Sequence, residues 1–378
     1  MKFKYFWVSL AAGFALTLIW LLVSLPAASQ TAVRLQTSPP LSQVVPNTEP
    51  VQLTVQAIDV NQQPIADANI QVRLLTPPKT PWFTSDFPIV EGTTLLELGA
   101  IAPAGKLQFE QVLPIRGTYR LEANVTPQTA GAFEPFEQIL TLAVSENSVK
   151  YRNVGILITI LLLTGFGGGW VIGGDQTARE GEIAPQPVRM LLSAATLLAI
   201  VVLLTVNITA EIAEARSPHH SAAASADPAI AQAQGIRVEL LGDRQATVGQ
   251  TATQTILVTD TTTQEPIANT AVNLQAIALE HNERVFTFAG VTDQSGKLTW
   301  QQQFFNGAPH QVSATIAPET NSSRQFAPIQ VAHEVEVEGI APPLTIRLIS
   351  LIYFTAIFVV GLIAGFLGHR RFQARSIA

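Results

Sequence analysis

The sequence predicts a membrane protein with transmembrane α-helices and two all-β sandwich domains, built as a tandem duplication of a helix–β domain–helix unit. Charged residues make up 13% of the 378 residues, against roughly a quarter in a typical soluble domain. The mean hydropathy is +0.29. Four long apolar segments account for this composition, and the regions between them alternate apolar and polar residues as half-buried strands do.

Each apolar segment is about 17–24 residues long, which is enough to cross a hydrocarbon core of roughly 30 Å. The last three are predicted to span a membrane. The first follows Lys2 and Lys4 and precedes the small residues of 27–29, so it fits a cleaved signal peptide. It also fits an uncleaved signal anchor, which the internal repeat described below favours.

Charge predicts the orientation. The N-terminus carries Lys2 and Lys4, and the C-terminal tail carries Arg370, Arg371 and Arg375. Residues 31–150 hold seven basic and eleven acidic side chains, and residues 213–342 hold six and thirteen. Because basic residues favour the cytoplasmic side, we expect a multi-pass protein of the cell (inner or plasma) membrane. Both β domains are then extracytoplasmic, and both termini are cytoplasmic if the first helix is uncleaved.

The predicted segments follow one another along the chain. They are a signal anchor or signal peptide (5–25), a first β-sandwich (31–148), a transmembrane helix (154–174), a cytoplasmic loop (175–189), a transmembrane helix (190–207), a flexible Ala/Ser linker (213–235), a second β-sandwich (236–340), a transmembrane helix (344–367) and a basic tail (368–378).

The two β regions repeat each other. Gly105-Lys106-Leu107 corresponds to Gly296-Lys297-Leu298 at an offset of 191 residues, and Tyr119 corresponds at the same offset to His310. The offset also carries Val154 to Thr345, where the last apolar segment begins. We therefore expect an internal duplication, in which the first apolar segment is the counterpart of the third.

The second β region contains a set of turn and strand motifs. They comprise Asp260, the turn before Pro266-Ile267-Ala268, Val272, and the strand entry at 292–298. With this set the region resembles the immunoglobulin-like modules of bacterial surface proteins, of the invasin type. The resemblance implies a β-sandwich fold and, in such families, a role as spacer, adhesive or docking surface. The first region departs from it, with Ala102-Pro103-Ala104 in place of Asp293-Gln294-Ser295.

The first β region has extra length at 77–88, where three aromatic residues, Trp82, Phe83 and Phe87, lie among prolines. Aromatic side chains of this kind anchor protein interfaces, so this loop is the candidate partner-binding site. The alternative is a lid that folds down over its own sandwich.

Glycines recur at a spacing of four in two of the apolar segments. They are Gly165, Gly169 and Gly173 in one, and Gly361 and Gly365 in the other. Small residues at this spacing allow close helix packing. We expect contact between the two segments or between protomers.

Histidines offer a metal-binding hypothesis, through His219, His220, His281 and His310, because imidazole binds copper and zinc. The alternatives are a solvated pair in the linker and ordinary surface or edge-strand histidines. Further along, Glu334, Glu336 and Glu338 share one face of an alternating strand, which indicates a solvated face or a weak cation site.

Several functional classes lack their signatures. There is no cysteine, no nucleophile elbow, no zinc-protease motif and no phosphate-binding loop, and the net charge of −6 gives no reason to expect nucleic acid. The sequence therefore predicts a non-enzymatic protein without cofactor, which binds or scaffolds a protein partner, or forms homo-oligomers, at the lipid bilayer. The alternatives are extracytoplasmic copper or zinc handling and an accessory subunit of a transporter.

Overall fold

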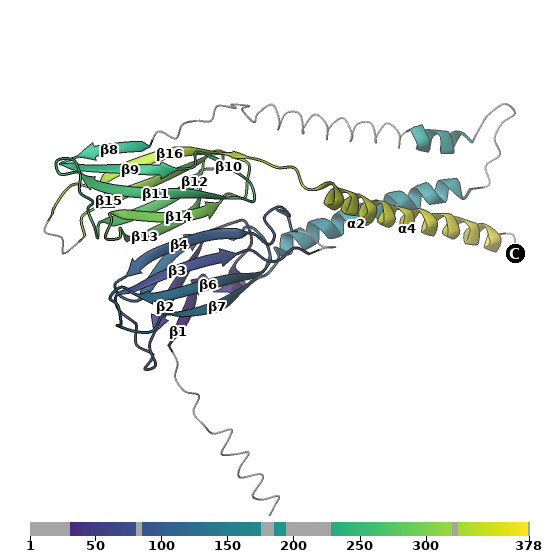
Figure 1. The fold of residues 1–378 in the computed structure, drawn as a ribbon. Helices are drawn as coiled ribbons and strands as arrows, with labels where there is room; N and C mark the ends of the chain where they lie inside the picture. The colour runs from purple at the N-terminus through teal and green to yellow at the C-terminus, as the bar shows by residue number, and fades with distance from the viewer. Residues whose placement is uncertain (1–30, 81–84, 175–184, 194–227, 320–323, 377–378) are drawn as a thin grey trace, which may run out of the picture.

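The computed structural model describes residues 31–80, 85–174, 185–193, 228–319 and 324–376 (Figure 1). We call residues 31–174 the first half and residues 228–376 the second half. The first half contains β1 (Ala32–Ser38), the short 3-10 helix η1 (Leu41–Gln43), β2 (Val51–Ile58), β3 (Ala68–Leu75), β4 (Thr94–Ala102), β5 (Lys106–Gln111), β6 (Gly117–Pro127), β7 (Phe136–Val144) and α2 (Ser148–Ile172). The second half contains β8 (Ala229–Ala233), β9 (Ile236–Gly242), β10 (Gln245–Thr247), β11 (Thr251–Asp260), β12 (Ala271–Ala278), β13 (Glu283–Val291), β14 (Lys297–Gln303), β15 (His310–Ala317), β16 (Ile329–Glu338) and α4 (Leu344–Ser376).

The strands of the first half form a Greek-key sandwich. One layer has the order β1-β2-β5, and the other has the order β7-β6-β3-β4. Tyr119, at the start of β6, donates its hydroxyl hydrogen to the Ile115 carbonyl (2.6 Å) and accepts from the Ile115 amide (2.9 Å). A tyrosine bonded to the backbone a few residues upstream is typical of immunoglobulin-like sandwiches, so the first half has this fold.

The two halves share both sheets. One sheet has the order β1-β2-β5-β13-β12-β15-β16-β10, and the other has the order β7-β6-β3-β4-β14-β11-β9-β8. In the first sheet three strands of the first half continue into five of the second half, and in the second sheet four strands of each half lie side by side. The two places where the halves pair, β5 with β13 and β4 with β14, are called the seam below.

The pairing at the seam has matching registers. In one sheet Phe288 lies opposite Phe109 and Phe286 opposite Gln111. In the other sheet Leu98 lies opposite Trp300 and Leu96 opposite Gln302. A rotation that exchanges the two halves therefore superposes the β5–β13 pair on the β14–β4 pair, as in a two-fold symmetric interface.

The sequence predicts two separate sandwiches, at 31–148 and 236–340, and the structure instead joins their strands into one sandwich. The physical reason is that β4, β5, β13 and β14 would be edge strands if each half stood alone. Their exposed amides and carbonyls would remain open to association with other chains. Pairing across the seam satisfies them within the chain.

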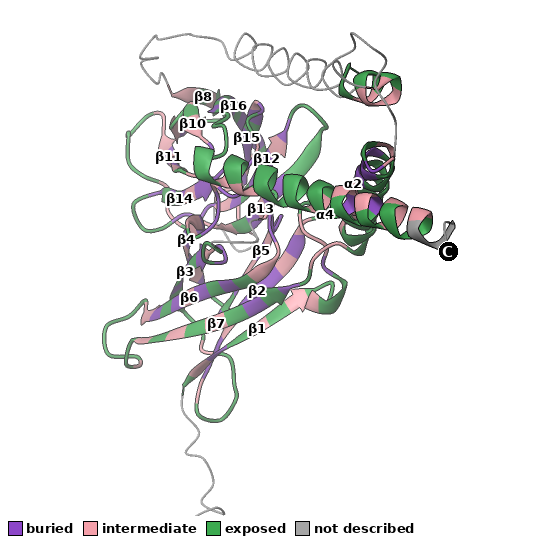
Figure 2. Cartoon of the chain, turned by 90° about the vertical axis from the view of Figure 1, so that its right-hand side faces the viewer, coloured by how far each residue is buried: buried purple, intermediate pink, exposed green. Residues whose placement is uncertain are grey.

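The core is continuous across the seam. Buried side chains of both halves form one cluster, in which Phe109, Leu98, Phe288 and Trp300 meet where the halves pair. Figure 2 shows buried positions running through the strands of both halves, while α4 is exposed along most of its length. The two halves therefore share their hydrophobic stabilisation.

Among the described residues, two helices are long and apolar enough to cross a membrane, α2 and α4. Each follows the last long strand of its half, and they lie beside each other outside the sandwich (Figure 1). Both run away from the sandwich in the same direction, because contacts of α2 with α4 advance together along both helices. The first apolar segment (5–25) and most of the third (190–207) lie outside the described residues.

Three segment boundaries differ from the predicted ones. β8 forms within the predicted linker 213–235, because Gln234 and Gly235, with φ of 53° and 78°, make a tight turn that pairs β8 with β9. Residues 186–193 are helical, so a helix starts inside the predicted loop 175–189. Helix α4 continues to Ser376, through most of the predicted basic tail 368–378.

Candidate functional site

The long loop between β3 and β4 is held against the second half of the chain. Phe87 is partly buried and meets the ring of Phe305 edge-on, with 5.8 Å between ring centroids. The Gln303 amide donates to the Thr93 hydroxyl over 2.9 Å. Phe87, predicted as a partner contact, thus packs within the protein, whereas Trp82 and Phe83 lie outside the described residues.

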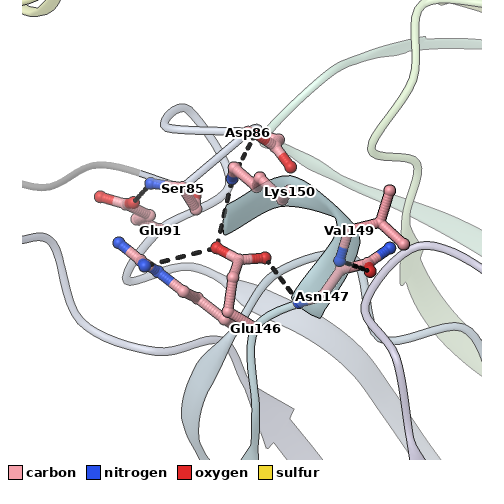
Figure 3. A network of polar contacts seen from close by, with 8 residues as sticks. Ser85, Asp86, Glu91, Glu146, Asn147, Val149 and Lys150 are labelled. Atoms are coloured by element: carbon pink, nitrogen blue, oxygen red, sulfur yellow. Dashed lines mark hydrogen bonds and ion pairs between the residues drawn. The ribbon is translucent and has the colours of Figure 1, made fainter. Parts of the chain in front are cut away.

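The same loop is tied to the first turn of α2 by a network of ion pairs (Figure 3). The Lys150 ammonium lies 2.6 Å from an Asp86 carboxylate oxygen and 3.2 Å from Glu146. Glu146, whose side chain is 6% exposed, also pairs with Arg116 at 3.3 Å. We call Asp86, Arg116, Glu146 and Lys150 the junction network, because they join loop, sandwich and helix at one point.

The start of α2 is capped beside this network. The Asn147 side chain accepts a hydrogen bond from the Val149 amide at 2.9 Å, and the Glu146 carboxylate accepts from the Asn147 amide at 3.1 Å (Figure 3). Such side-chain acceptors satisfy amides that have no partner inside a helix. The junction network therefore fixes the residue at which strand gives way to helix.

Two clefts on the described surface lie at opposite ends of the sandwich. The first, of about 460 Å³, lies between the loop at 46–48, Asp86 and the first turns of α2. The second, of about 560 Å³, lies at the other end of the sandwich, where β3 and β4 face the turn at 293–295. The polar part of the second cleft's lining is mostly neutral, namely Asn69, Gln71, Gln128, Gln294, Ser295 and Thr299, with one acidic and one basic residue, Asp293 and Lys297, beside them.

The five predicted packing glycines lie where α2 crosses α4. A Cβ atom on Gly165 would overlap the carbonyl oxygen of Phe358, and one on Gly361 would overlap that of Leu162. The same holds for Gly169 with Leu362 and for Gly365 with Phe166, and a Cβ on Gly173 would be in tight contact, at 3.1 Å, with the Phe366 carbonyl oxygen. Only residues without a side chain allow two backbones to approach this closely.

Among the described residues, no group of three or more histidine, aspartate or glutamate side chains is placed to hold a metal ion. His281 is exposed in the turn before β13. His310 is fully buried, with Nδ1 2.7 Å from the Ala308 carbonyl and its ring 4.5 Å from that of Phe304. The prediction of a surface or edge-strand His310 is wrong, because β15 lies between β12 and β16. His219 and His220 lie outside the described residues.

Burial changes the acidity of two histidines. It lowers the pKa of His310 to about 4, against a smaller opposing effect of the hydrogen bond to Ala308. It also lowers the pKa of His333 to about 4, with a further contribution from the positive charge of Arg244. Both rings are therefore neutral at physiological pH. They face inward, while Glu334, Glu336 and Glu338 point outward from β16 and are exposed.

Only one part of the junction network has a signal in the sequence. Glu146 and Lys150 stand four residues apart around Asn147, which is the spacing of a helical ion pair next to a cap residue. The partners Arg116 and Asp86 come from distant parts of the chain, so no local pattern indicates them.

No family model matches this chain, and no curated protein matches it in sequence. Among solved structures, the Yersinia pseudotuberculosis adhesin InvE is similar at 12% identity and a TM-score of 0.20, over 82% of this chain and 61% of the adhesin. The D0-D1 domain of intimin is similar at 13% identity and a TM-score of 0.19, over 78% and 93%. A trypsin-activated alpha-2-macroglobulin from Escherichia coli is similar at 12% and 0.20, over 83% and 18%.

Of these three structures, the first is named as an adhesin. With TM-scores this low, however, none of the three supports an argument about this chain. The assignment of an immunoglobulin-like fold rests on the strand order and on the bonding of Tyr119.

Proposed function

We propose that this protein is an integral membrane protein that holds one rigid sandwich outside the cytoplasmic membrane, as a non-catalytic module for binding or scaffolding a protein partner. The observation that carries this proposal is that α2 and α4 run parallel and in contact with each other. Both leave the same end of a sandwich that is continuous across the seam, and they cross at glycines. A sandwich held by two crossed helices is suited to present a binding surface at a fixed distance from the membrane.

The proposed topology follows from the direction of the helices. Because α2 and α4 are parallel, the stretch of chain that connects the end of α2 to the second half must cross back to the side of the membrane on which the sandwich lies. The apolar segment 190–207 is long enough to make this crossing. The basic residues Arg370 and Arg371 follow α4's apolar part and favour a cytoplasmic end there. We further propose that the architecture arose by duplication of a helix–β–helix unit, which the matching seam registers support.

The partner surface is proposed at the end of the sandwich that faces away from the helices. The second cleft lies there, and residues of both halves line it, among them Gln71 of β3 and Thr299 of β14. Most of its polar groups are neutral amides and hydroxyls, with Asp293 and Lys297 as the two charged residues. Neutral groups form hydrogen bonds without the desolvation cost of charges, so this lining suits a polar, reversible protein contact.

Topology is tested by thiol labelling, which is simple because the chain contains no cysteine. Two variants each introduce one thiol, Thr299→Cys on the sandwich and Arg371→Cys beyond the apolar part of α4. We expect a membrane-impermeant maleimide to label the first variant in spheroplasts and the second only after lysis. Labelling in the opposite order, or of both variants in intact spheroplasts, would overturn the proposed placement.

The binding role is tested with a photo-activated cross-linker on a single thiol in native membranes. Gln294→Cys places it in the second cleft, and Thr141→Cys places it on the exposed face of β7 as a matched control. We expect one protein adduct of defined mass from Gln294→Cys that is absent from Thr141→Cys and is lost when Gln71 is replaced by Arg. The same adducts from both positions, or none from Gln294→Cys, would contradict a binding surface at this cleft.

A further inference from the structure

The lining of the first cleft changes from polar to apolar along α2. It lies between the sandwich and the first turns of α2 and has a volume of about 460 Å³. Near the start of α2 it is lined by Thr48, Asp86, Glu146 and Lys150, and further along the helix by Val154 and Leu157. Asn153 stands between the two parts. A ligand that fills this cleft needs a charged end and an apolar end.

The change from polar to apolar lining occurs where α2 would enter the hydrocarbon core. From Val154 to Ile172 the helix rises about 28 Å, close to the roughly 30 Å thickness of that core. Lys150 and Asn147 then lie in the headgroup layer of the outer leaflet. Val154 and Leu157, 44% and 39% exposed, lie at the level of the acyl chains.

The charges of the junction network, of which Asp86, Glu146 and Lys150 line the cleft, are balanced. Lys150 and Arg116 are positive, and Asp86 and Glu146 are negative. Glu146 is almost fully buried within the network, whereas the Asp86 side chain is 64% exposed and that of Lys150 is 31% exposed. The accessible pair thus offers one cation and one carboxylate side by side, which is complementary to a zwitterion.

We propose that this cleft binds an outer-leaflet glycerophospholipid whose headgroup carries a primary amine. The phosphodiester lies at the Lys150 ammonium and the Asn153 amide, the headgroup ammonium donates hydrogen bonds to Asp86, and an acyl chain lies along Val154 and Leu157. A quaternary ammonium cannot donate such bonds, and a headgroup without a cation gives Asp86 no partner beyond Lys150. The proposal rests on the proposed membrane placement of α2.

The corresponding place in the second half lacks these groups. Before α4 the described chain runs through residues 339–343, and Arg347 donates its Nε hydrogen to the Pro342 carbonyl at 2.8 Å. The lipid site is therefore expected on one side of the helix pair only. This asymmetry supplies a control position on α4.

The test is native mass spectrometry of the full-length chain, purified in detergent and supplied with phosphatidylethanolamine, phosphatidylglycerol or phosphatidylcholine. Asn153→Trp fills the middle of the cleft, and Ser350→Trp places the same bulk on the exposed surface of α4. We expect phosphatidylethanolamine to be retained by the wild type and Ser350→Trp, and about tenfold less by Asn153→Trp, as for the loss of one charge-assisted contact. Equal retention by the two tryptophan variants would overturn the site.

A second variant tests the headgroup. Asp86→Asn removes the carboxylate and retains a side chain of similar shape, and unchanged circular dichroism verifies its fold. We expect this variant to bind phosphatidylethanolamine and phosphatidylglycerol equally, whereas the wild type prefers the former. A wild type without that preference, or a preference that survives in Asp86→Asn, would overturn the assignment. Because binding is measured in micelles, this result is independent of the thiol-labelling test of topology.

Discussion

The first and second halves of the chain pair through matching registers but differ at the end that faces the helices. In the first half, residues 76–93 connect β3 to β4, and the junction network joins this loop to α2. In the second half, residues 279–282 make the corresponding connection, and residues 339–343 lead into α4. The shared elements thus build the common body, and the chemistry specific to this protein lies where the halves differ.

The seam offers the strongest test of this comparison. Trp300→Ala and Phe109→Ala truncate counterpart side chains, which are 2% and 1% exposed, and each is expected to cost about 4 kcal/mol of unfolding free energy. Because the core is continuous, we expect a single unfolding transition in both variants, measured by circular dichroism in micelles. Two separate transitions, one for each half, would show that the halves fold independently.

The helix crossing gives a second matched pair. Gly169→Leu and Gly365→Leu each place a side chain against backbone of the other helix, so we expect similar losses of about 3 kcal/mol from overpacking. Gly155→Leu is the control, because no atom lies within 4 Å of a Cβ there. The measurement is unfolding in mixed micelles. A control as unstable as the two variants would contradict close packing at the crossing.

Tyr119 and His310 occupy counterpart positions in the two halves, but only His310 is expected to lower the stability of the fold at acid pH. The pKa of His310 is about 4 in the fold and 6.5 as its reference value. The unfolded chain therefore binds more protons between these two values, so stability is fully present above about pH 6.5 and falls by up to about 3 kcal/mol as pH decreases to about 4.

We expect His310→Tyr to remove this part of the acid loss, because tyrosine stays neutral there, while His333 keeps its own part. His281→Asn, at an exposed position, is the control and should follow the wild type. The measurement is the free energy of unfolding at pH 7, 5.5 and 4. An unchanged pH profile in His310→Tyr would contradict the assignment.

The junction network is expected to have a smaller effect. Glu146→Gln leaves Arg116 and Lys150 without their shared carboxylate in a partly buried place, which we expect to cost about 2 kcal/mol. Arg73→Gln removes a 4.0 Å pair with Glu122 whose arginine is 51% exposed, and should change stability by less than about 0.5 kcal/mol. Chemical unfolding of the two variants compares them, and equal effects would argue against a structural role for the network.

The local parts of the fold were predictable from the sequence. Alternation at Leu53, Val55 and Ala57 predicts a strand face, and these side chains are fully buried. The spacing of Gly165 and Gly361 with their neighbours predicts close helix packing, and they lie in the crossing. In each case the spacing of residues along a single strand or helix indicates which of them share one face of that element.

The seam and the junction were not predictable in this way. Pairing of β5 with β13 depends on strand edges that are far apart in the chain, and alternation is the same for an edge strand and a central strand. Likewise, His310 looks like a polar surface residue in the sequence, and only the position of β15 inside the sheet explains its burial.

The seam also has a consequence for the synthesis of the protein. The strands β4 and β5 emerge about 190 residues before their partners β13 and β14, which at roughly 5–20 residues per second corresponds to about 10–40 s. During that interval two strand edges of the first half have no partner in the chain. A newly made first half can therefore pair with a neighbouring copy through these edges. Once the second half is complete, β13 and β14 cover the edges and end this risk.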